Sequence, residues 1–271
     1  MRLLLTGATG FVGRNFLKHV VEKGLYEEIY LPLRNVQKWE RQLTEDGLFG
    51  NRSLTVLKGE APNWKFPTVS VDHVVHCAGH LFGREKESYW DCHVKGTANL
   101  FQHTRDVKRA LLLSSLSAGG PCRGAEDAKT EKSIDQPLSW YGQSKLEMES
   151  MALIANYPFE VLALRPPIVL GPRDSATRPL YDMVKRPFWL KPGLTPKLLS
   201  FIAVQDLVEC ILHALWHKTS WLRLPHRFYY VGYPEPVTDR EMLVTAGSYF
   251  GRKGLLRGKV IPLPNWLGLS H

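Results

Sequence analysis

Short apolar runs alternate with helical patterns along most of the chain. Leu3-Leu4-Leu5 is continuously apolar, which is typical of a strand buried on both faces of a parallel sheet. Val12, Phe16 and Val20 then recur at helical spacing, and the following Gly24 suits the end of a helix. The same reasoning predicts strands at 29–33, 54–57, 71–76, 109–114 and 159–164, and helices at 90–105 and 139–156.

This alternation predicts an α/β fold, a Rossmann-type, doubly wound parallel sheet with right-handed crossovers. Ligands of such a sheet bind in the crevice at the carboxyl ends of the strands. Pro32 conflicts with the pattern, because the second strand should be internal and proline cannot donate to the strand ladder. We therefore expect a bulge or a strand end near Pro32.

The pattern changes after residue 165, where prolines become frequent up to Pro196. They indicate an irregular segment, which we interpret as the start of a substrate-binding lobe. Helical spacing returns between Leu207 and Leu215, a further strand is expected at 228–231, and the stretch from Thr238 to Glu241 has the spacing of a capping box. We expect a Rossmann domain at 1–165 and a small C-terminal lobe at 166–271, interleaved with the Rossmann core.

Composition and charge narrow the classes of partner. The chain has 271 residues, 44% of them hydrophobic, which is enough for a full core. Its formal net charge of +9 favours contact with anions such as a cofactor phosphate, a nucleic acid or an anionic membrane surface. The basic residues are scattered and no nucleic-acid-binding signature is present, so we expect no nucleic-acid partner.

The cysteines and the apolar runs bear on the compartment. Cys77, Cys92, Cys122 and Cys210 show neither CxxC spacing nor a histidine at metal-ligand spacing, which argues against a disulfide framework and a zinc site. The first strand begins at Arg2, so no signal peptide is expected, and no apolar run approaches the length of a membrane span. We expect a cytoplasmic protein without a metal. Peripheral membrane contact and a homodimer both remain compatible with the sequence.

A glycine-rich turn directly follows the first strand. The spacing Gly7-x-x-Gly10-x-x-Gly13 opens a helix, where backbone N–H groups can approach a pyrophosphate at the positive end of the helix dipole. This context predicts a dinucleotide cofactor bound along the turn, on Gly7, Thr9, Gly10, Phe11, Val12 and Gly13.

The residues after the second strand bear on the choice of cofactor. An acidic residue there would accept the adenosine ribose hydroxyls of NAD, whereas this chain has Leu33-Arg34-Asn35, with Lys38 beyond. Arg34 can pair with a 2′-phosphate, which favours NADP(H) over NAD(H). The alternative is that Arg34 is an ordinary solvated arginine.

Tyr141 and Lys145 lie four residues apart and so share one face of the helix expected at 139–156. Together with Ser115 at the end of a strand, they supply a phenol, a cation and a hydroxyl that can move a proton at a carbinol carbon. We expect Lys145 to stabilise the phenolate and lower the pKa of Tyr141 toward neutrality.

Taken together, these residues resemble the short-chain dehydrogenase/reductase superfamily, and specifically its extended (atypical) branch, the NAD-dependent epimerase/dehydratase family. The resemblance covers most of the chain. The motifs that carry it are Thr6 to Gly13, His76-Cys77-Ala78-Gly79, Gly96-Thr97-x-Asn99-Leu100, Ser114-Ser115, Tyr141 to Lys145, Leu164-Arg165-Pro166-Pro167-x-Val169-x-Gly171-Pro172 and Phe201-Ile202-x-Val204-x-Asp206-Leu207.

The resemblance implies roles for individual residues. Tyr141 would be the proton donor or acceptor, Lys145 would bind the nicotinamide ribose, and Ser115, or failing it Ser117, would hydrogen-bond the reacting oxygen. Glu60 falls where the family usually has an aspartate near adenine. Further cofactor contacts would come from Ala78, Gly79, Tyr141, Lys145, Pro166, Ile168 and Val169.

The chain also departs from the family pattern. His93 stands where an asparagine is usual, while His76 and His80 are interpreted as packing or loop histidines. Members that act on nucleotide sugars usually place an asparagine and an arginine on the diphosphate, and Ile168 and Leu199 occupy those places here. An apolar side chain cannot replace an anion-binding donor, although Lys197 or Arg173 could compensate.

The Arg-Pro-Pro-x-Val form is similar to that of reductase and hydroxysteroid-dehydrogenase members. It predicts an NADP(H)-dependent oxidoreductase for an apolar or aromatic hydroxy or keto compound, a small-molecule substrate. A nucleotide-sugar epimerase or dehydratase and a noncatalytic NADP(H)-sensing or scaffold protein are the alternatives. Family members tend to enter another helix near Pro262, so we expect residues that close the pocket to be missing. Exposed Trp266 and Leu267 would alternatively mark a partner or membrane contact.

Overall fold

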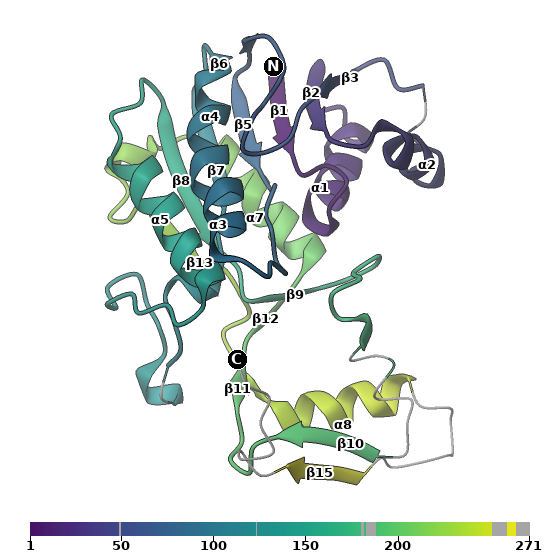
Figure 1. Ribbon diagram of the computed structural model, residues 1–271, viewed down its shortest axis with the longest axis vertical. Helices are drawn as coiled ribbons and strands as arrows, with labels where there is room; N and C mark the ends of the chain where they lie inside the picture. The colour runs from purple at the N-terminus through teal and green to yellow at the C-terminus, as the bar shows by residue number, and fades with distance from the viewer. Residues whose placement is uncertain (49, 123, 180–181, 183–187, 251–258, 264–271) are drawn as a thin grey trace.

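Seven parallel strands form one sheet in the order β13-β8-β7-β5-β1-β2-β3 (Figure 1). The computed structural model describes residues 1–48, 50–122, 124–179, 182, 188–250 and 259–263. The chain adds strands outward from β1 to β3 and then continues on the other side of β1, so the order of strand addition reverses between β1 and β5. The predicted doubly wound sheet is confirmed. Its strands are β1 (Arg2–Thr6), β2 (Glu28–Leu33), β3 (Leu54–Lys58), β5 (His73–His76), β7 (Arg109–Leu113), β8 (Glu160–Arg165) and β13 (Phe228–Tyr230).

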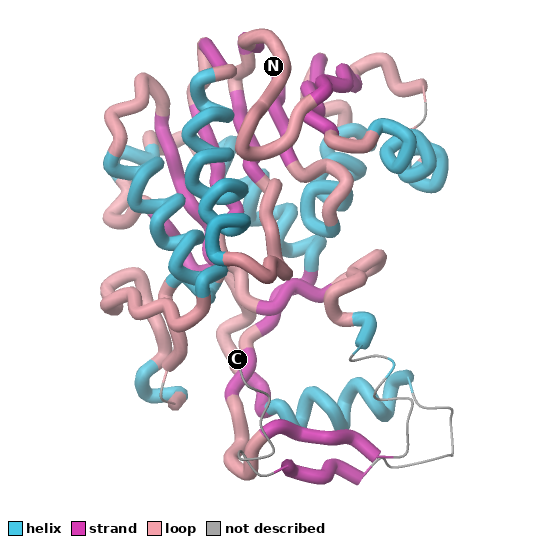
Figure 2. The backbone as a smooth tube through the Cα atoms, viewed as in Figure 1, coloured by secondary structure: helices cyan, strands magenta, loops and turns pink. Residues whose placement is uncertain are grey.

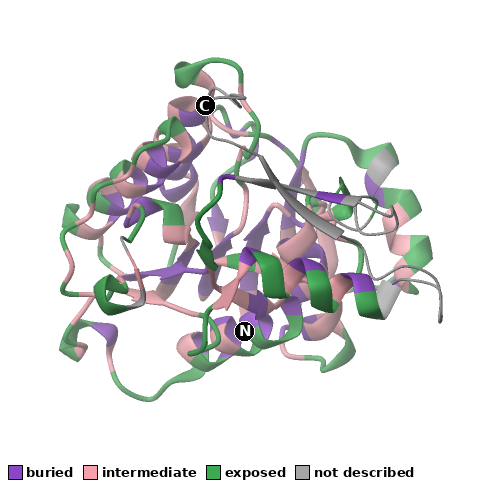
Figure 3. Cartoon of the chain, turned by 90° about the horizontal axis from the view of Figure 1, so that it is seen from below, coloured by how far each residue is buried: buried purple, intermediate pink, exposed green. Residues whose placement is uncertain are grey.

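Helices cover both faces of the sheet (Figure 2). Successive side chains of a strand point to opposite faces, so Leu3 and Leu5 pack with α1 and α7, whereas Leu4 packs with α4 and α5. Buried residues therefore run along the strands in the middle of the molecule (Figure 3). The helices are α1 (Phe11–Glu22), α2 (Val36–Asp46), α3 (Lys86–Trp90), α4 (Gly96–Gln102), α5 (Trp140–Ile154), α7 (Val204–Trp216) and α8 (Asp239–Phe250).

Two of these helices differ from the sequence prediction. The helix expected at 90–105 begins earlier and is continuous through α3, a π-helical turn η1 (Asp91–Lys95) and α4. Helix α2 was not predicted, although Trp39 and Leu43 lie on one face and pack against the core. The short turns are η2 (Leu116–Ala118), η3 (Ala125–Asp127) and η4 (Trp221–Arg223).

Pro32 lies inside β2, in register with Leu57 of β3. The pairing of β2 with β1 ends at Tyr30, and β2 itself ends at Leu33. Pro32 therefore lies beyond the last residue of β2 that pairs with β1, so its lack of an N–H costs no hydrogen bond to β1. The strand end expected near the proline comes one residue later, at Leu33.

Residues after 166 are divided between the sheet and a second group of elements. Helix α7 and strand β13 return to the sheet, whereas β10, β15 and α8 lie together at the lower end of Figure 1. Thr238 and Glu241 form the expected capping box at α8, because the Thr238 N–H donates to Glu241 Oε2 at 2.8 Å and the Glu241 N–H donates to Thr238 Oγ1 at 3.1 Å. The short strands pair as β9 (Ile168–Leu170) with β12 (Phe201–Ala203), β11 (Leu198–Leu199) with β14 (Val237–Thr238), β10 (Phe188–Pro192) with β15 (Lys259–Leu263), and β4 (Val69–Ser70) with β6 (Thr104–Arg105). Within the described ranges no helix has the length and apolar character needed to cross a bilayer.

Candidate functional site

The glycine turn brings three backbone segments into contact. Gly7 has a φ of +71°, and a Cβ there would lie 2.6 Å from the carbonyl carbon of Cys77. A Cβ on Gly13 would lie 2.3 Å from Gly7 O. Gly10 caps α1, so Phe11 and Val12 are its first residues. Only glycine allows this close approach, and the exposed helix start that results fits a bound pyrophosphate.

Helix α2 is joined to this turn by polar contacts that the sequence did not reveal. The Arg14 Nε donates to Asp46 Oδ2 at 2.6 Å, and the Gln42 amide donates to Thr9 O at 3.3 Å. The hydrogen bond with Asp46 raises the pKa of Arg14. Asp46 also pairs with Arg173, at 2.7 Å. Arg173, which the sequence offered as a compensating cation, is thus paired with a carboxylate of the protein.

The carboxyl end of β5 lies against the glycine turn. Thr6 Oγ1 accepts from the Ala78 N–H at 3.2 Å and lies 2.7 Å from His76 Nδ1. Burial lowers the pKa of His76 to about 3, so this histidine is neutral, in agreement with a packing role. A Cβ on Gly79 would lie 3.5 Å from Lys145 Nζ, which places the predicted contacts Ala78 and Gly79 beside the predicted catalytic lysine.

A pocket of about 240 Å³ lies beyond the ends of β2 and β3. Arg34 and Glu60, both predicted as cofactor contacts, line it, and Arg34 Nε lies 3.5 Å from Glu60 Oε2. Arg34 is 81% exposed and therefore available to a ligand. Lys58 and Lys65 also line the pocket, and the sequence had not singled them out. The side chain of Lys38 lies outside the described residues.

Helix α5 carries Tyr141 and Lys145. It begins after Ser139, whose Oγ accepts from the Gly142 N–H at 3.1 Å. Lys145 is 3% exposed, its Nζ donates to Leu113 O at 2.8 Å, and burial lowers its pKa to about 8. The lysine is thus a buried cation held at the end of β7.

Burial raises the pKa of Tyr141, and a hydrogen bond with Ser115 opposes that rise in part. Lys145 is not among the groups that shift the pKa of Tyr141, and its ammonium donates to the Leu113 carbonyl instead. The expectation that Lys145 lowers the pKa of Tyr141 is therefore wrong for this arrangement. Tyr141 is a protonated phenol at neutral pH.

Ser115 begins the turn η2, where its Oγ accepts from the Ser117 N–H at 3.1 Å. It is Ser115 that contacts Tyr141, while Ser117 is exposed. Pro166 lies beside this turn, since its carbonyl accepts from the Leu116 N–H at 2.8 Å. The structure thus brings Ser115, Tyr141 and Pro166 to one place.

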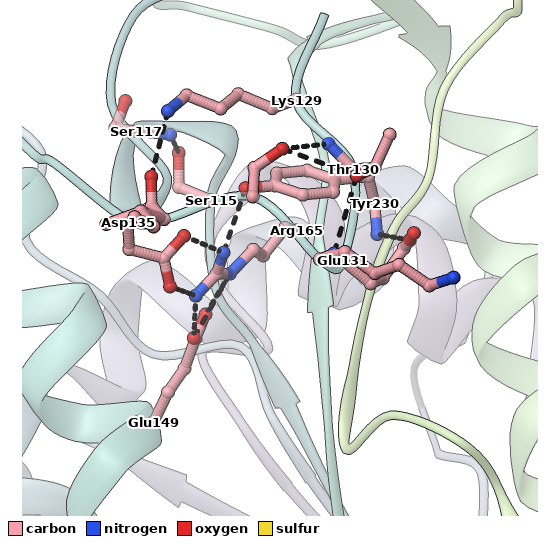
Figure 4. A network of polar contacts seen from close by, with 12 residues as sticks. Ser115, Ser117, Lys129, Thr130, Glu131, Asp135, Glu149, Arg165 and Tyr230 are labelled. Carbon is pink, nitrogen blue, oxygen red and sulfur yellow. Dashed lines mark hydrogen bonds and ion pairs between the residues drawn. The ribbon is translucent and has the colours of Figure 1, made fainter.

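Arg165 forms a buried polar network that the sequence did not predict (Figure 4). Its guanidinium donates to Asp135 at 2.7 Å and to Glu149 at 2.9 Å, and it lies 3.7 Å from the centre of the Phe228 ring. Burial lowers the pKa of Arg165, but the two carboxylates more than offset this, and the pKa is raised. The network joins β8, α5 and β13. Its partners lie far apart in the sequence, so the sequence pattern does not indicate it.

The apolar residues that the sequence analysis assigned to the substrate side lie on the short strands β9 and β11. Ile168 is 38% exposed on β9, Val169 packs against the core, and Leu199 is half-buried on β11. Lys197 is exposed. The residues at the chain end, Trp266 and Leu267, lie outside the described residues.

The sheet, the glycine turn and the Ser115–Tyr141–Lys145 group define an enzyme of the Rossmann-type, nicotinamide dinucleotide-binding class. The chain belongs to the NAD dependent epimerase/dehydratase family, because the sequence model of that family matches residues 3–222. The resemblance expected from the sequence is thereby confirmed, and with it the membership in the extended short-chain dehydrogenase/reductase group.

Individual relatives differ in their chemistry. The chain is 30% identical over 232 residues to a UDP-glucose 4-epimerase of Vibrio cholerae, covering 80% of this chain and 67% of that protein. It is 25% identical over 183 residues to a decarboxylating sterol-4-alpha-carboxylate 3-dehydrogenase of Saccharomyces cerevisiae, covering 64% of this chain and 52% of that protein. The chain thus spans between half and two thirds of these relatives.

Among solved structures, the chain is similar to UDP-glucuronic acid 4-epimerase from Bacillus cereus in complex with UDP-glucuronic acid and NAD. The TM-score is 0.78 with 18% identity, covering 97% of this chain and 86% of that one. At this identity the likeness concerns the fold.

Proposed function

We propose that this chain is an NADP(H)-dependent oxidoreductase that acts on an apolar or aromatic hydroxy or keto compound. The observation that carries the proposal is the meeting of three groups at neighbouring strand ends. Ser115 hydrogen-bonds Tyr141, and Lys145 lies one helical turn from Tyr141, buried beside Gly79. A phenol, a hydroxyl and a cation so placed can move a proton at the oxygen of a ketone or alcohol.

The glycine turn and the basic pocket would hold the cofactor. When bound, the nicotinamide supplies or accepts the hydride. The turn at Gly7–Gly13 would bind the pyrophosphate, and Arg34, Lys58 and Lys65 surround the pocket expected to take the adenosine end. Their positive charge supports a 2′-phosphate there, and hence NADP(H) rather than the NAD named for the solved relative.

Tyr141 would transfer the proton. Because burial raises its pKa, the phenol keeps its proton at neutral pH and can donate it to a ketone oxygen that is becoming an alcohol. Ser115 would hydrogen-bond the same oxygen. The protonated phenol is the form that the reduction of a ketone requires.

Apolar side chains near the site support the substrate class. Leu81 and Phe82, in the loop after β5, are 54% and 81% exposed, and Leu138 and Trp140, just before Tyr141, are 78% and 49% exposed. They supply exposed apolar surface after β5 and beside Tyr141, and Ile168 and Leu199 add apolar side chains on β9 and β11, which suits an apolar or aromatic compound. The sterol named for the yeast relative is a compound of this kind.

A nucleotide-sugar epimerase is the second candidate, favoured by the 30% identity to the Vibrio cholerae enzyme. The two candidate functions differ in how the cofactor is used. An epimerase oxidises and reduces the same sugar and keeps its cofactor bound, whereas the proposed oxidoreductase exchanges NADP(H) at each turnover.

The test is a direct comparison of substrates. Purified protein would be incubated with NADPH and a panel of apolar and aromatic ketones, and separately with NAD and UDP-glucose. We expect NADPH oxidation with at least one ketone and no change of the nucleotide sugar. Conversion of UDP-glucose without net cofactor turnover would overturn the proposal in favour of the epimerase.

A further inference from the structure

His93 is completely buried beside the proposed catalytic tyrosine, and both of its ring nitrogens have partners. It lies in the π-helical turn η1 between α3 and α4. The His80 backbone N–H lies 3.0 Å from His93 Nε2, and His93 Nδ1 lies 2.8 Å from Ser144 Oγ. These contacts connect the loop after β5 with helix α5.

The partners determine which nitrogen carries the proton. A backbone N–H can only donate, so Nε2 of His93 must accept. Burial, together with smaller contributions from the neighbouring Lys145, His76 and His80, lowers the pKa of His93 to about 2, so the ring is neutral. Its single proton is therefore on Nδ1, which donates to Ser144 Oγ. Ser144 in turn donates to Tyr141 O at 2.9 Å.

The ring of His93 also packs against the Tyr141 ring. Their centroids are 5.6 Å apart and the planes meet at 76°, an edge-to-face contact. Tyr89 contacts both rings, at 6.2 Å from His93 and 6.3 Å from Tyr141. Tyr89 Oη accepts from the Gly83 N–H at 2.8 Å, so Tyr89 and His93 hold both ends of the loop that carries Leu81 and Phe82.

We infer that His93 is a positioning residue with two separable tasks. Through Nδ1 and Ser144 it holds the backbone of Tyr141 in place for proton transfer, and through Nε2 it holds the apolar 79–83 loop at the substrate site. The inference rests on the proposed function, because it assigns the two hydrogen bonds to catalysis and to substrate binding respectively.

Two substitutions separate the tasks. In His93→Asn the amide can occupy the position of Nδ1 and donate to Ser144, but it cannot reach His80. In His93→Gln the amide oxygen can occupy the position of Nε2 and accept from His80, but the link to Ser144 is lost. Ser144→Ala removes the same link without altering the histidine.

With the ketone substrate, we expect His93→Gln and Ser144→Ala each to lower kcat about tenfold with little change in KM, the loss expected for one hydrogen bond. We expect His93→Asn to raise KM about tenfold with kcat nearly unchanged. His213→Gln, on the exposed side of α7, is the matched control and should change neither constant. The reverse pattern, or equal effects of the Asn and Gln variants on both constants, would overturn the assignment.

A second readout needs no turnover. Nitrogen-15 NMR of the His93 ring should show a neutral imidazole with its proton on Nδ1 from pH 5 to pH 9. The carbon-13 signal of the Tyr141 ring should move in Ser144→Ala, which breaks the link to Tyr141 but keeps the His93 ring packed against it. If these signals behave as expected while no ketone is reduced, the positioning of Tyr141 stands and the proposed function fails. A proton on Nε2, or a Tyr141 signal that stays unchanged in Ser144→Ala, would refute the positioning itself.

Discussion

Arg173 forms an ion pair with Asp46, with 2.7 Å between Nη2 and Oδ1. Arg173 has a φ of +72°, an uncommon backbone conformation for a residue other than glycine, and this pair helps to hold it. The same carboxylate accepts from Arg14, which follows the glycine turn. One nearly buried carboxylate thus joins the cofactor turn to the segment that leaves β9.

Removing that carboxylate should destabilise the fold. In Asp46→Ala, Arg14 keeps a charge that is 90% buried, so we expect the free energy of unfolding to fall by about 3 kcal/mol. Urea unfolding measures the loss. Glu45→Ala is the control, because Glu45 is 65% exposed and its loss should cost below about 1 kcal/mol. Equal stability of the two variants would contradict the joining role of Asp46.

Gly13→Ala should abolish dinucleotide binding. Its Cβ would lie 2.3 Å from Gly7 O, so the turn must open and its backbone N–H groups must move. We expect NADPH affinity to fall by about 100-fold or more, from the loss of several charged hydrogen bonds. Titration of NADPH fluorescence measures it. Gly124→Ala, where a Cβ meets nothing within 4 Å, should bind normally.

Arg34→Ala should change the choice of cofactor. We expect NADPH affinity to fall about 10- to 100-fold, the value of a charged hydrogen bond to phosphate, while NADH affinity stays the same. Calorimetric titration of both cofactors against wild type and variant gives the answer. Equal affinity of the wild type for NADPH and NADH would show that Arg34 does not select the phosphate.

Tyr141→Phe should remove the proton donor and leave the packing of the ring intact. We expect ketone reduction to slow by about 100-fold or more, the usual contribution of a positioned acid. Steady-state kinetics and NADPH binding should be measured together, since binding is expected to be unchanged. Retention of wild-type kcat would assign proton transfer to another group.

Lys145→Met should make stability less dependent on pH. Burial lowers the pKa of Lys145 from 10.5 to about 8, so the unfolded chain holds a proton between these values that the folded chain has lost. Burying the charged lysine therefore lowers the free energy of unfolding by its full amount below pH 8. This loss becomes smaller as the pH rises toward 10.5, because the folded protein then holds a neutral amine.

The free energy of unfolding of the methionine variant, relative to that of wild type, should consequently fall by about 2.5 kcal/mol between pH 7 and pH 10. Urea unfolding at the two pH values tests this, and a pH-independent difference would exclude a depressed pKa. Ketone reduction by this variant should be lost at both pH values.

The sequence predicted those parts of the site that depend on local pattern. The strand, turn and helix around Gly10 follow from glycine spacing and helical periodicity, and the meeting of Ser115 with Tyr141 follows from the order of strands in a parallel sheet. The pKa of Tyr141 could not be obtained in this way, because it depends on burial and on the direction in which Lys145 points.

The Arg165 network and the pairing of Arg14 with Asp46 were also missed. Each joins residues from different elements, and nothing in the spacing of an arginine distinguishes a buried ion pair from a solvated surface charge. His93 was noticed as a departure from the family pattern, but its task follows only from the two partners of its ring.

The pairing of β9 with β12 has a consequence for how such proteins diversify. After the seven-stranded sheet, the chain passes through β9 into the segment that holds β10 and β11. It returns through β12, directly before α7. Insertions and deletions between Leu170 and Phe201 are therefore separated from the glycine turn and from helix α5, which carries Tyr141. Changes in the length of this segment can therefore be absorbed at the paired strands β9 and β12, without displacing the dinucleotide-binding half of the sheet.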